Sequence, residues 1–374
     1  MAMTSTVNPA SVADRLQTHF SKKLLEVQID ELVMAQEGLG VQEDLPKNIG
    51  ARTLRFFKPA LASTTLRGAS PTAASGVVGK FAVGSADEGV AISTFRENDW
   101  TKVDVSLEQY VQATKISDVV SMIDAYMPLK QNIDLMGRDA ALFFDSLIRN
   151  ALVGSTHPDG STTPLTHGSN GTNGCELFVN GAGTVVNSGT SATNFANLSA
   201  LSQANGKATR ATVLTAVTRL KHNKAPKLRG GRYVCLLPPA VQHDLVQDSD
   251  YKQAFQNNGD KGVFARELAN LDGCRFIEHT NPFTEDETYG THDETDDNGD
   301  GLIYATMFLG RGAFGCPKLS GTKSPLAPQV FINDKPDKSD PANQFIVAAW
   351  KCFLMAVGLD SRNLVVARSK STFI

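Results

Sequence analysis

Apolar residues recur every three or four positions between residues 16 and 33 of the chain. The positions on this stripe are Leu16, Phe20, Leu24 and Val27, with Leu25, Ile29, Leu32 and Val33 beside them. This spacing places apolar side chains on one face of an α-helix. Gly38 and Gly40 follow, and glycine is common just beyond the end of a helix. The pattern predicts an amphipathic helix within an N-terminal arm that occupies residues 1–50.

Two later segments have the apolar pattern of strands. Residues 51–63 are rich in apolar and aromatic side chains, and residues 101–118 alternate apolar with polar positions, as at Val103 and Val105. Alternation of this kind is typical of a strand with one buried face, and we expect the two segments to pair. Residues 64–100 between them are rich in glycine, alanine and serine. Such a segment cannot pack a core of its own, so we predict an extended loop that contacts another subunit.

A helical pattern begins after Pro128 and ends before Gly154. Its apolar positions form two adjacent stripes, one of Ile133, Met136, Ala140, Phe143, Leu147 and Ala151 and the other of Phe144, Ile148 and Leu152. Proline is favoured in the first turn of a helix and glycine just after its end. We therefore predict a helix of about five turns in this region.

The middle of the chain predicts a mixed α/β unit. Residues 154–210 are dominated by glycine, serine, threonine and asparagine, which favours loops and small hairpins. After them we expect a helix at 211–225, a buried strand at 232–239, a helix at 240–248 and a strand at 274–279. A strand, a helix and a second strand in this order suggest a mixed α/β unit.

Strands dominate the C-terminal quarter. The segment "LIYATMFL" at 302–309 is rich in branched and aromatic residues, and residues 344–369 contain two or three further apolar runs around the turn "GLDSRN". Both features favour strands over helices.

Composition and charge exclude several functional classes. The chain has 374 residues, of which 41% are hydrophobic and 20% charged, enough for two or three domain-sized units. Thirty-six basic and 39 acidic side chains give a net charge of −3, which does not favour binding along nucleic-acid phosphates. The N-terminal segment has no apolar run of signal-peptide length, and no stretch is long and apolar enough to span a membrane. We expect a soluble protein made in the cytoplasm.

Acidic residues are concentrated between Phe283 and Gly301. This stretch contains no Lys or Arg and eight carboxylates, at Glu285, Asp286, Glu287, Asp293, Glu294, Asp296, Asp297 and Asp300. Asp296, Asn298 and Asp300 fit the first three ligand positions of a helix-loop-helix calcium site. Its twelfth position is Met307, which cannot bind calcium, and the second helix is replaced by a predicted strand. A solvated acidic loop is the favoured interpretation.

The other motifs do not indicate an enzyme. "GRGAFG" at 310–315 matches a dinucleotide fingerprint, but the three prolines in 317–328 prevent the helix that such a site needs. The cysteines are scattered, at Cys175, Cys235, Cys274, Cys316 and Cys352. This distribution argues against a disulfide framework and against structural zinc. We expect a glycine-rich turn at 310–315 and buried, unreactive thiols within the apolar runs.

Two polar features are also open to a functional interpretation. His243 is followed by Asp244, but adjacent residues on a helix do not face each other, so an ordinary, partly exposed histidine is favoured over a catalytic base. The basic segment 224–232 could contact phosphates. Because it contains Pro226 and two glycines between a helix and a strand, we interpret it as a solvated turn.

The order of these segments resembles the tailed-phage major capsid proteins of the Hong Kong 97-like fold. The stretches that carry the resemblance are "KKLLEVQIDELVMAQ", "LPKNIGARTLRFFKPALAS", "VSLEQYVQATKISDVV", "DAALFFDSLIRNALV", "GGRYVCLLPPAVQHDL", "LDGCRFIEHTNPF", "YATMFLGRGAFG" and "FIVAAWKCFLMAVGLDSRNLVVARS". They occur in this order over most of the chain. The resemblance implies an α+β fold with an N-terminal arm, an extended β-hairpin loop, a long spine helix and a mixed α/β axial domain.

The resemblance also implies a division of the chain. The expected parts are an N-terminal arm (1–50), the extended loop (51–115), a peripheral domain with the spine helix (116–210), an axial domain (211–345), and closing strands that return to the peripheral domain (346–374). The acidic insert at 283–301 and the segment at 154–210 are longer than the family pattern requires. We expect both to decorate the surface of a shell.

The implied function is structural and not enzymatic. A major capsid protein self-assembles into the icosahedral shell that encloses a phage double-stranded DNA genome. The implied partners are further copies of the chain in hexamers and pentamers, scaffolding and portal proteins, and a decoration protein, with DNA enclosed but not bound sequence-specifically. No cofactor and no membrane is implied. The expected location is the virion capsid, after synthesis in the cytoplasm of the bacterial host.

Candidate intersubunit contacts lie on the extended loop. They are Arg55, Phe56, Phe57, Lys58, Arg96 and Trp100. Trp, Phe and Arg are enriched in protein interfaces, which is why these positions are chosen. Packing against the helix of the same subunit is the alternative for each of them.

Three other functions remain open at this point. A cellular encapsulin-type nanocompartment shell would share the same fold and would be distinguished by a cargo enzyme or by a neighbouring portal gene. A calcium-stabilised surface protein would use the acidic loop at 293–301, and calcium should then raise its melting temperature. A nucleotide-dependent enzyme would need the helix that the "GRGAFG" segment lacks.

Overall fold

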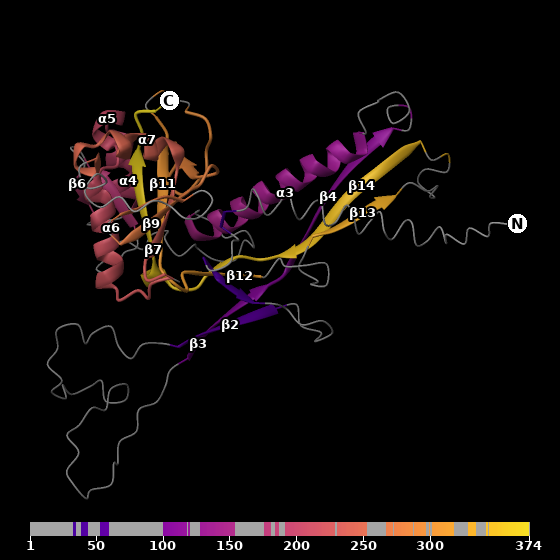
Figure 1. Ribbon diagram of the computed structural model, residues 1–374, viewed down its shortest axis with the longest axis horizontal. Coiled ribbons are helices and arrows are strands. Elements are labelled where there is room, and N and C mark those ends of the chain that lie inside the picture. Colours follow the sequence, from indigo (N-terminus) through magenta and orange to yellow (C-terminus); the bar gives the residue numbers. More distant parts are fainter. Residues whose placement is uncertain are drawn as a thin grey trace, which may run out of the picture. The chain divides into compact units, whose positions relative to one another are not determined.

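The computed structural model describes most of the chain from residue 100 onward and short segments before it (Figure 1). The described residues are 33–34, 39–43, 53–59, 100–117, 119, 128–153, 176–180, 184–186, 191–228, 230–252, 267–271, 273–286, 288–296, 299, 301–317, 328–333, 342 and 344–373. The chain divides into two compact units, one formed by 51–106 and the other by 1–50 with 107–374. The predicted N-terminal helix (except Val33) and the loop at 64–99 lie outside the described residues.

The smaller unit contains an antiparallel hairpin. Its strands are β2 (Thr53–Pro59) and β3 (Trp100–Ser106), and their pairing confirms the predicted partnership. The predicted second strand is divided, however. Beyond Leu107 the chain continues as β4 (Glu108–Ser117), which belongs to the larger unit and pairs in another sheet. The two compact units therefore separate at residue 106, and not at 115.

The larger unit contains the long helix α3 (Pro128–Val153), which begins and ends where the sequence predicts. Its 26 residues make about seven turns, more than the five expected. Figure 1 shows α3 along a three-stranded antiparallel sheet in the order β13 (Gln329–Asn333), β14 (Phe345–Leu354), β4. Phe144 of α3 packs edge-to-face on Trp350 of β14, with ring centroids 5.7 Å apart. Phe143, predicted on the buried stripe, is partly exposed instead and contacts Tyr110 of β4.

An eight-stranded mixed sheet forms the other main part of the larger unit. The strand order is β6 (Thr184–Val186), β5 (Glu176–Asn180), β16 (Leu364–Lys370), β11 (Ile303–Leu309), β7 (Tyr233–Leu237), β9 (Cys274–Glu278) and β8 (Glu267–Leu271), with β10 (Phe283–Glu285) paired to the start of β11. Every residue of β7 and β16 is buried. Burial on both faces explains why β7 and the first four residues of β16 are continuous apolar runs and do not alternate with polar residues.

Helices connect and cover this sheet. They are α4 (Ser191–Ser199), α5 (Gln203–Gly206), α6 (Arg210–His222) and α7 (Pro239–Gln247). β7 and β9 are parallel and α7 lies between them in sequence, which confirms the predicted mixed α/β unit. Apolar residues of α6 and α7, such as Val217 and Leu245, share a buried cluster with Phe276 of β9. The helix α4 was not predicted from the sequence of 154–210.

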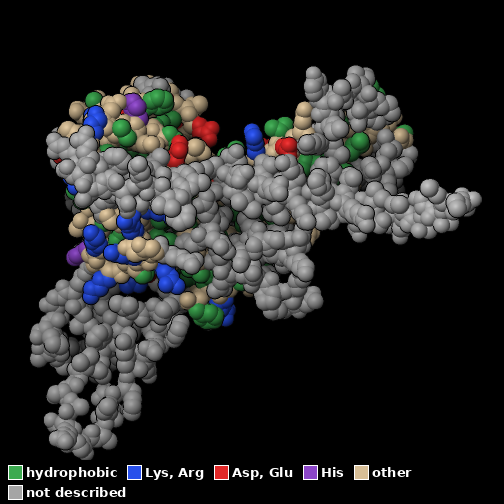
Figure 2. All heavy atoms as spheres, in the orientation of Figure 1, with side chains coloured by type: hydrophobic (Ala, Val, Ile, Leu, Met, Phe, Trp, Pro, Cys, Tyr) green, Lys and Arg blue, Asp and Glu red, His purple; other side chains and the backbone are tan. Residues whose placement is uncertain are grey.

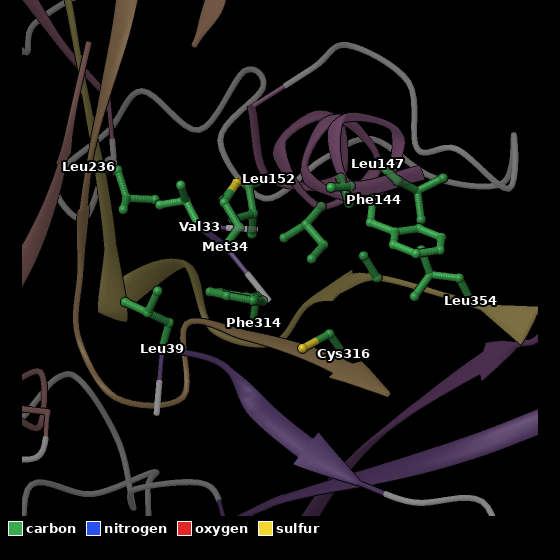
Figure 3. Packing of buried hydrophobic residues seen from close by; sticks show 14 of the residues in the cluster. Val33, Met34, Leu39, Phe144, Leu147, Leu152, Leu236, Phe314, Cys316 and Leu354 are labelled. Carbon is green, nitrogen blue, oxygen red and sulfur yellow. The ribbon is translucent and has the colours of Figure 1, made fainter. Parts of the chain in front are cut away.

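A small sheet joins the N-terminal residues to the core. It contains β1 (Val41–Glu43), β12 (Phe314–Pro317) and β15 (Val357–Gly358), with β1 parallel to β12. Figure 3 shows Val33, Met34 and Leu39 in one buried cluster with Leu152 of α3 and Phe314. A side chain at Gly40 would lie 2.5 Å from the Phe314 ring, so this close approach requires glycine.

The two long C-terminal strands, β14 and β16, belong to different sheets. β14 pairs with β4 beside α3, as expected for strands that return to that region. After the turn at η2 (Ser361–Asn363), however, β16 enters the eight-stranded sheet between β5 and β11. The predicted hairpin within 154–210 is present as β5 and β6, but it also joins this sheet. Within the described part of the chain, no helix is long and apolar enough to cross a membrane.

Candidate assembly surfaces

The β2–β3 hairpin has one buried face and one exposed face. Leu54, Phe56 and Val105 are buried, whereas Arg55 and Asp104 on the opposite face are exposed. The last two lie directly across the hairpin and form a bidentate ion pair, with 2.5 Å from Nε to Oδ1 and 2.9 Å from Nη2 to Oδ2. The hydrogen bond to Asp104 raises the pKa of Arg55. Because water screens this pair, it specifies the strand register more than it stabilises the fold.

The predicted contact residues fall on different sides of this hairpin. Phe57 has 64% of its surface exposed, whereas Phe56 has 2%. Arg55 is exposed beside Phe57. Lys58 and Trp100 contribute backbone to β2 and β3, but their side chains, like all of Arg96, lie outside the described part of the chain. The exposed face thus offers Phe57 and Arg55 for a contact, and residue types of this kind are enriched in interfaces.

Asp296, the first candidate calcium ligand, is already bonded to the backbone of its own loop. The carboxylate of Asp296 accepts hydrogen bonds from the backbone amides of Gly299 (2.8 Å) and Gly301 (2.9 Å). Met307 lies fully buried within β11, so a strand occupies the place of the second flanking helix. The residues that the structure describes contain no group of three acidic, histidine or cysteine side chains suited to a metal, while Asn298 and Asp300 lie outside them.

The start of the acidic insert is part of the core. Glu285 of β10 lies with Glu176 of β5 around the guanidinium of Arg368 on β16, and all three side chains are completely buried. Nη1 of Arg368 is 2.5 Å from Glu176 Oε1, and Nε is 2.5 Å from Glu285 Oε2. The hydroxyl of Tyr289 donates to Glu176, and its ring lies 4.9 Å from the guanidinium. We call these four residues the Arg368 cluster.

The charges in the Arg368 cluster shift each other's protonation. Burial alone would lower the pKa of Arg368, but the charges of Glu285 and Glu176 outweigh burial and raise it. Burial raises the pKa of Glu285, although Arg368 and the Gly290 amide partly oppose the shift. One guanidinium therefore faces two carboxylates in a site inaccessible to water. A single positive charge balances only one of them, so ionisation of the other, Glu285, is unfavourable.

Further bonds fix the insert as a folded segment. The hydroxyl of Thr284 donates a hydrogen bond to the carbonyl of Asp293. In the other direction, the backbone amide of Asp293 donates to the carbonyl of Thr284 at 2.9 Å. Together with the Arg368 cluster, these bonds show that residues 283–286 and 288–293 are anchored to the sheet. The expectation that the whole insert is a surface decoration was wrong for this part, because its first carboxylate has a buried cationic partner.

Two polar side chains of α3 hold distant segments. Asp145 accepts hydrogen bonds from the backbone amides of Val33 (2.9 Å) and Met34 (3.1 Å). Arg149 donates from Nη1 to the side chain of Asn281 (2.5 Å) and to the carbonyl of Pro282 (2.8 Å). Burial lowers the pKa of Arg149 to about 10. One turn of α3 thus positions both the N-terminal segment and the entry to β10.

The "GRGAFG" segment is a turn between two strands, and no helix follows it directly. It leaves β11 at Gly310, turns at Gly312 with φ 76°, and continues as β12 at Phe314. The amide of Arg311 donates to the carbonyl of Pro226 at 2.8 Å, so this turn lies beside the predicted basic turn at 224–232. Both predicted turns are confirmed.

Four of the five cysteines lie in the described part of the chain, and all four are buried. Cys235, Cys274, Cys316 and Cys352 are buried free thiols. Burial raises the pKa of Cys316 and of Cys352 to about 12, which keeps both thiols protonated and unreactive. Cys175 lies outside the described residues.

His243 is partly exposed, as predicted. Its ring nitrogen Nδ1 nevertheless lies 3.7 Å from Oδ1 of Asp244, so the expectation that these adjacent side chains do not face each other was wrong. The carboxylate of Asp244 is buried and accepts bonds from the amide and hydroxyl of Thr372, so it anchors the C-terminal segment.

The sequence reasoning missed the Arg368 cluster. The available signals were single charged residues inside apolar strands, Glu176 in "CELFVN" and Arg368 in "LVVARS". A charge in such a strand must find a buried partner, but the sequence does not say which one.

The family comparison and the structure comparison both point to phage capsid proteins. A family model described as phage capsid protein matches residues 100–366. A comparison with curated protein sequences gives no match.

Solved phage shells share the fold. The capsid of Ralstonia phage GP4 has a TM-score of 0.57 and 13% identity, over 91% of this chain and 89% of that chain. The capsid asymmetric unit of cyanophage Pam1 has a TM-score of 0.57 and 13% identity, over 93% of each chain. The capsid of cyanophage P-SCSP1u has a TM-score of 0.54 and 13% identity, over 90% and 88%. These similarities confirm the predicted Hong Kong 97-like fold.

Proposed function

The chain belongs to the phage capsid protein family, and on this premise we propose that its copies close into a shell by placing the 51–106 unit across a neighbouring copy. The protein is a structural major capsid protein, and its place is the virion capsid. Its role in the virion is mechanical, and we assign it no catalytic step. The proposal concerns which surfaces make the contacts and which other components take part.

The separate 51–106 unit carries the proposal. The hairpin is the described part of a unit that is compact apart from the rest of the chain. Its outward face presents Phe57, with Arg55 held in place by Asp104. A phenylalanine with most of its surface in water gains stability when a second copy covers it. Repetition of one such contact by symmetry is sufficient to close a shell.

The division of the chain follows from the same proposal. Residues 1–50 act as an N-terminal arm, 51–106 as the extended loop, α3 with β4, β13 and β14 as the peripheral domain, and the eight-stranded sheet with its helices as the axial domain. The partners are further copies in hexamers and pentamers, a scaffolding protein, a portal protein and a decoration protein. The subunit is synthesised in the cytoplasm of a bacterial host and encloses double-stranded DNA without reading its sequence.

Assembly of a variant in the hairpin tests this proposal. The full chain is expressed with Phe57→Ser, and the particles are measured by sedimentation velocity and electron microscopy. Leu214→Ser is the matched control, because Leu214 is also an exposed apolar residue but lies on α6. We expect closed particles from the wild type and the control and a large loss of particles from Phe57→Ser. Normal particles from Phe57→Ser would remove the hairpin from the assembly contacts.

A further inference from the structure

Basic side chains gather at one end of the eight-stranded sheet. They come from the end of α6, the turn after it, and the loops that follow β11 and precede β16. We call this group the basic end, and it consists of Lys221, Lys224, Lys227, Arg232, Arg311 and Arg362. Figure 2 shows Lys and Arg side chains near the position of α6, in the lower part of this domain. Asp360 is paired with Arg362 at 3.2 Å.

Hydrogen bonds between the loops hold the basic end together. The amide of Arg311 donates to the carbonyl of Pro226 at 2.8 Å. The side chain of Asn223 donates to the carbonyl of Arg362 at 3.4 Å, and the side chain of Asn363 donates to the carbonyl of Arg311 at 3.0 Å. Three loops far apart in sequence therefore present their cationic residues on one preformed surface.

Acidic side chains gather at the opposite end of the same strands. The acidic end consists of Glu278, Asp293, Glu294 and Asp296. Glu278 is the last residue of β9, and Asp293 is bonded to Thr284 of β10, which pairs with the first residues of β11. The basic end lies where β11 finishes, so the two ends are separated by the length of that strand, about 20 Å.

Lys224 has a backbone conformation that does not favour lysine. Its φ is 53°, in the left-handed region, and it directly follows the C-cap Asn223 of α6. The amide of Ala225 donates to the carbonyl of Leu220 at 3.0 Å, which is the bond of a Schellman motif. Glycine is the preferred residue at this position. A lysine is unfavourable here for the fold alone, which points to a role for its charge outside the fold.

We propose that the basic end of one copy docks on the acidic end of the next copy in the shell. The inference rests on the proposed function and names the contact made by the axial domains. Opposite charges at the two ends of one domain make a head-to-tail contact self-complementary, and a head-to-tail contact that closes forms a ring. Packaged DNA is the alternative partner for the basic end, but it would leave the acidic end without a partner. The net charge of −3 also does not favour binding to DNA phosphates.

A charge swap tests the contact. Lys227→Glu and Glu294→Lys are made singly and together, and the association constant of the full chain is measured by sedimentation velocity at low salt. Each single change should lower it by about tenfold or more, and the double variant should return to within about threefold of the wild type. Lys115→Glu is the control, because this lysine lies on β4 in the other sheet. Unchanged association of both single variants, or no recovery in the double variant, would overturn the proposal.

A second variant separates the contact from folding. Lys224→Gly removes a charge but places glycine in the backbone conformation that favours it. We expect a higher melting temperature together with weaker association, and association equal to that of the wild type would contradict the proposal. If the changes at Lys224 and Lys227 weaken binding of a short DNA duplex but leave self-association intact, the basic end is a DNA surface and the proposal is wrong. Normal assembly of every variant defeats this inference alone, whereas a wild type that stays monomeric defeats the proposed function as well.

Discussion

Arg368 and Glu285 form an ion pair with 2.5 Å between Nε and Oε2, and neither side chain is accessible to water. The two residues are 83 positions apart in sequence. The pair connects β16, in the middle of the eight-stranded sheet, to β10 at the start of the acidic insert. Removal of Arg368 would leave Glu285 and Glu176 buried without their cation.

Arg368→Met should therefore destabilise the subunit strongly. The substitution leaves Glu176 and Glu285 buried without a cation, and breaking a buried pair of this kind costs about 3–5 kcal/mol. Chemical denaturation of the unassembled chain measures the change in the free energy of unfolding. Arg362→Met is the control, because Arg362 pairs with Asp360 in a partly exposed position, and it should cost less than about 1 kcal/mol. Equal effects of the two substitutions would contradict the buried role of Arg368.

The raised pKa of Glu285 predicts a pH dependence of stability. In the folded chain Glu285 holds its proton more tightly than in the unfolded chain. Its contribution to stability is therefore complete below the ordinary carboxyl pKa and is lost as the pH rises through the raised value. Glu285→Gln places an uncharged side chain at this position at every pH, so it should remove the contribution of Glu285 to the pH dependence of stability. Melting temperatures of both chains between about pH 4 and pH 8 give the test, and parallel curves would show that Glu285 does not titrate in this way.

Asp145 should control the exchange of two backbone amides. Its carboxylate accepts bonds from the amides of Val33 and Met34. Asp145→Asn preserves the size of the side chain but weakens both bonds, because a neutral amide is a poorer acceptor than a carboxylate. Hydrogen–deuterium exchange at Val33 and Met34 should become at least several-fold faster, while exchange in β7 stays the same. Unchanged exchange at the two amides would mean that the buried cluster around Leu152 is sufficient to hold this segment.

Calcium should not stabilise the subunit. Asp296 already bonds the amides of Gly299 and Gly301, and Met307 is buried in β11. Asp296→Ala should lower the free energy of unfolding by about 0.5–2 kcal/mol through loss of these bonds, equally with calcium or with a chelator. A melting temperature that rises with calcium in the wild type, but not in Asp296→Ala, would restore the calcium interpretation.

The spacing of apolar residues along the chain was sufficient to predict several helices and strands. Apolar residues at helical spacing identified α3 and α6. The proline at the start of α3 and the glycine after its end gave the bounds of that helix correctly. β7 and β11 were recognised because central strands are apolar on both faces. α4 was missed because serine, threonine and asparagine are weak helix formers, so tertiary packing of Phe195 and Leu198 determines this helix.

Contacts between distant segments could not be predicted in the same way. Glu176 and Arg368 are separated by 192 positions, and no local pattern connects them. The basic end depends on three loops that the sheet brings together, so the sequence indicated only one of them, the turn at 224–232. The order of segments was nevertheless sufficient to indicate the fold, because it reflects the whole topology and not one contact.

A reconstruction of assembled particles by electron cryomicroscopy shows the position of the 51–106 unit in every copy. We expect a closed icosahedral shell in which Phe57 of each copy is covered by a neighbouring copy. Particles that never form, or a shell in which Phe57 contacts only its own chain, would contradict it.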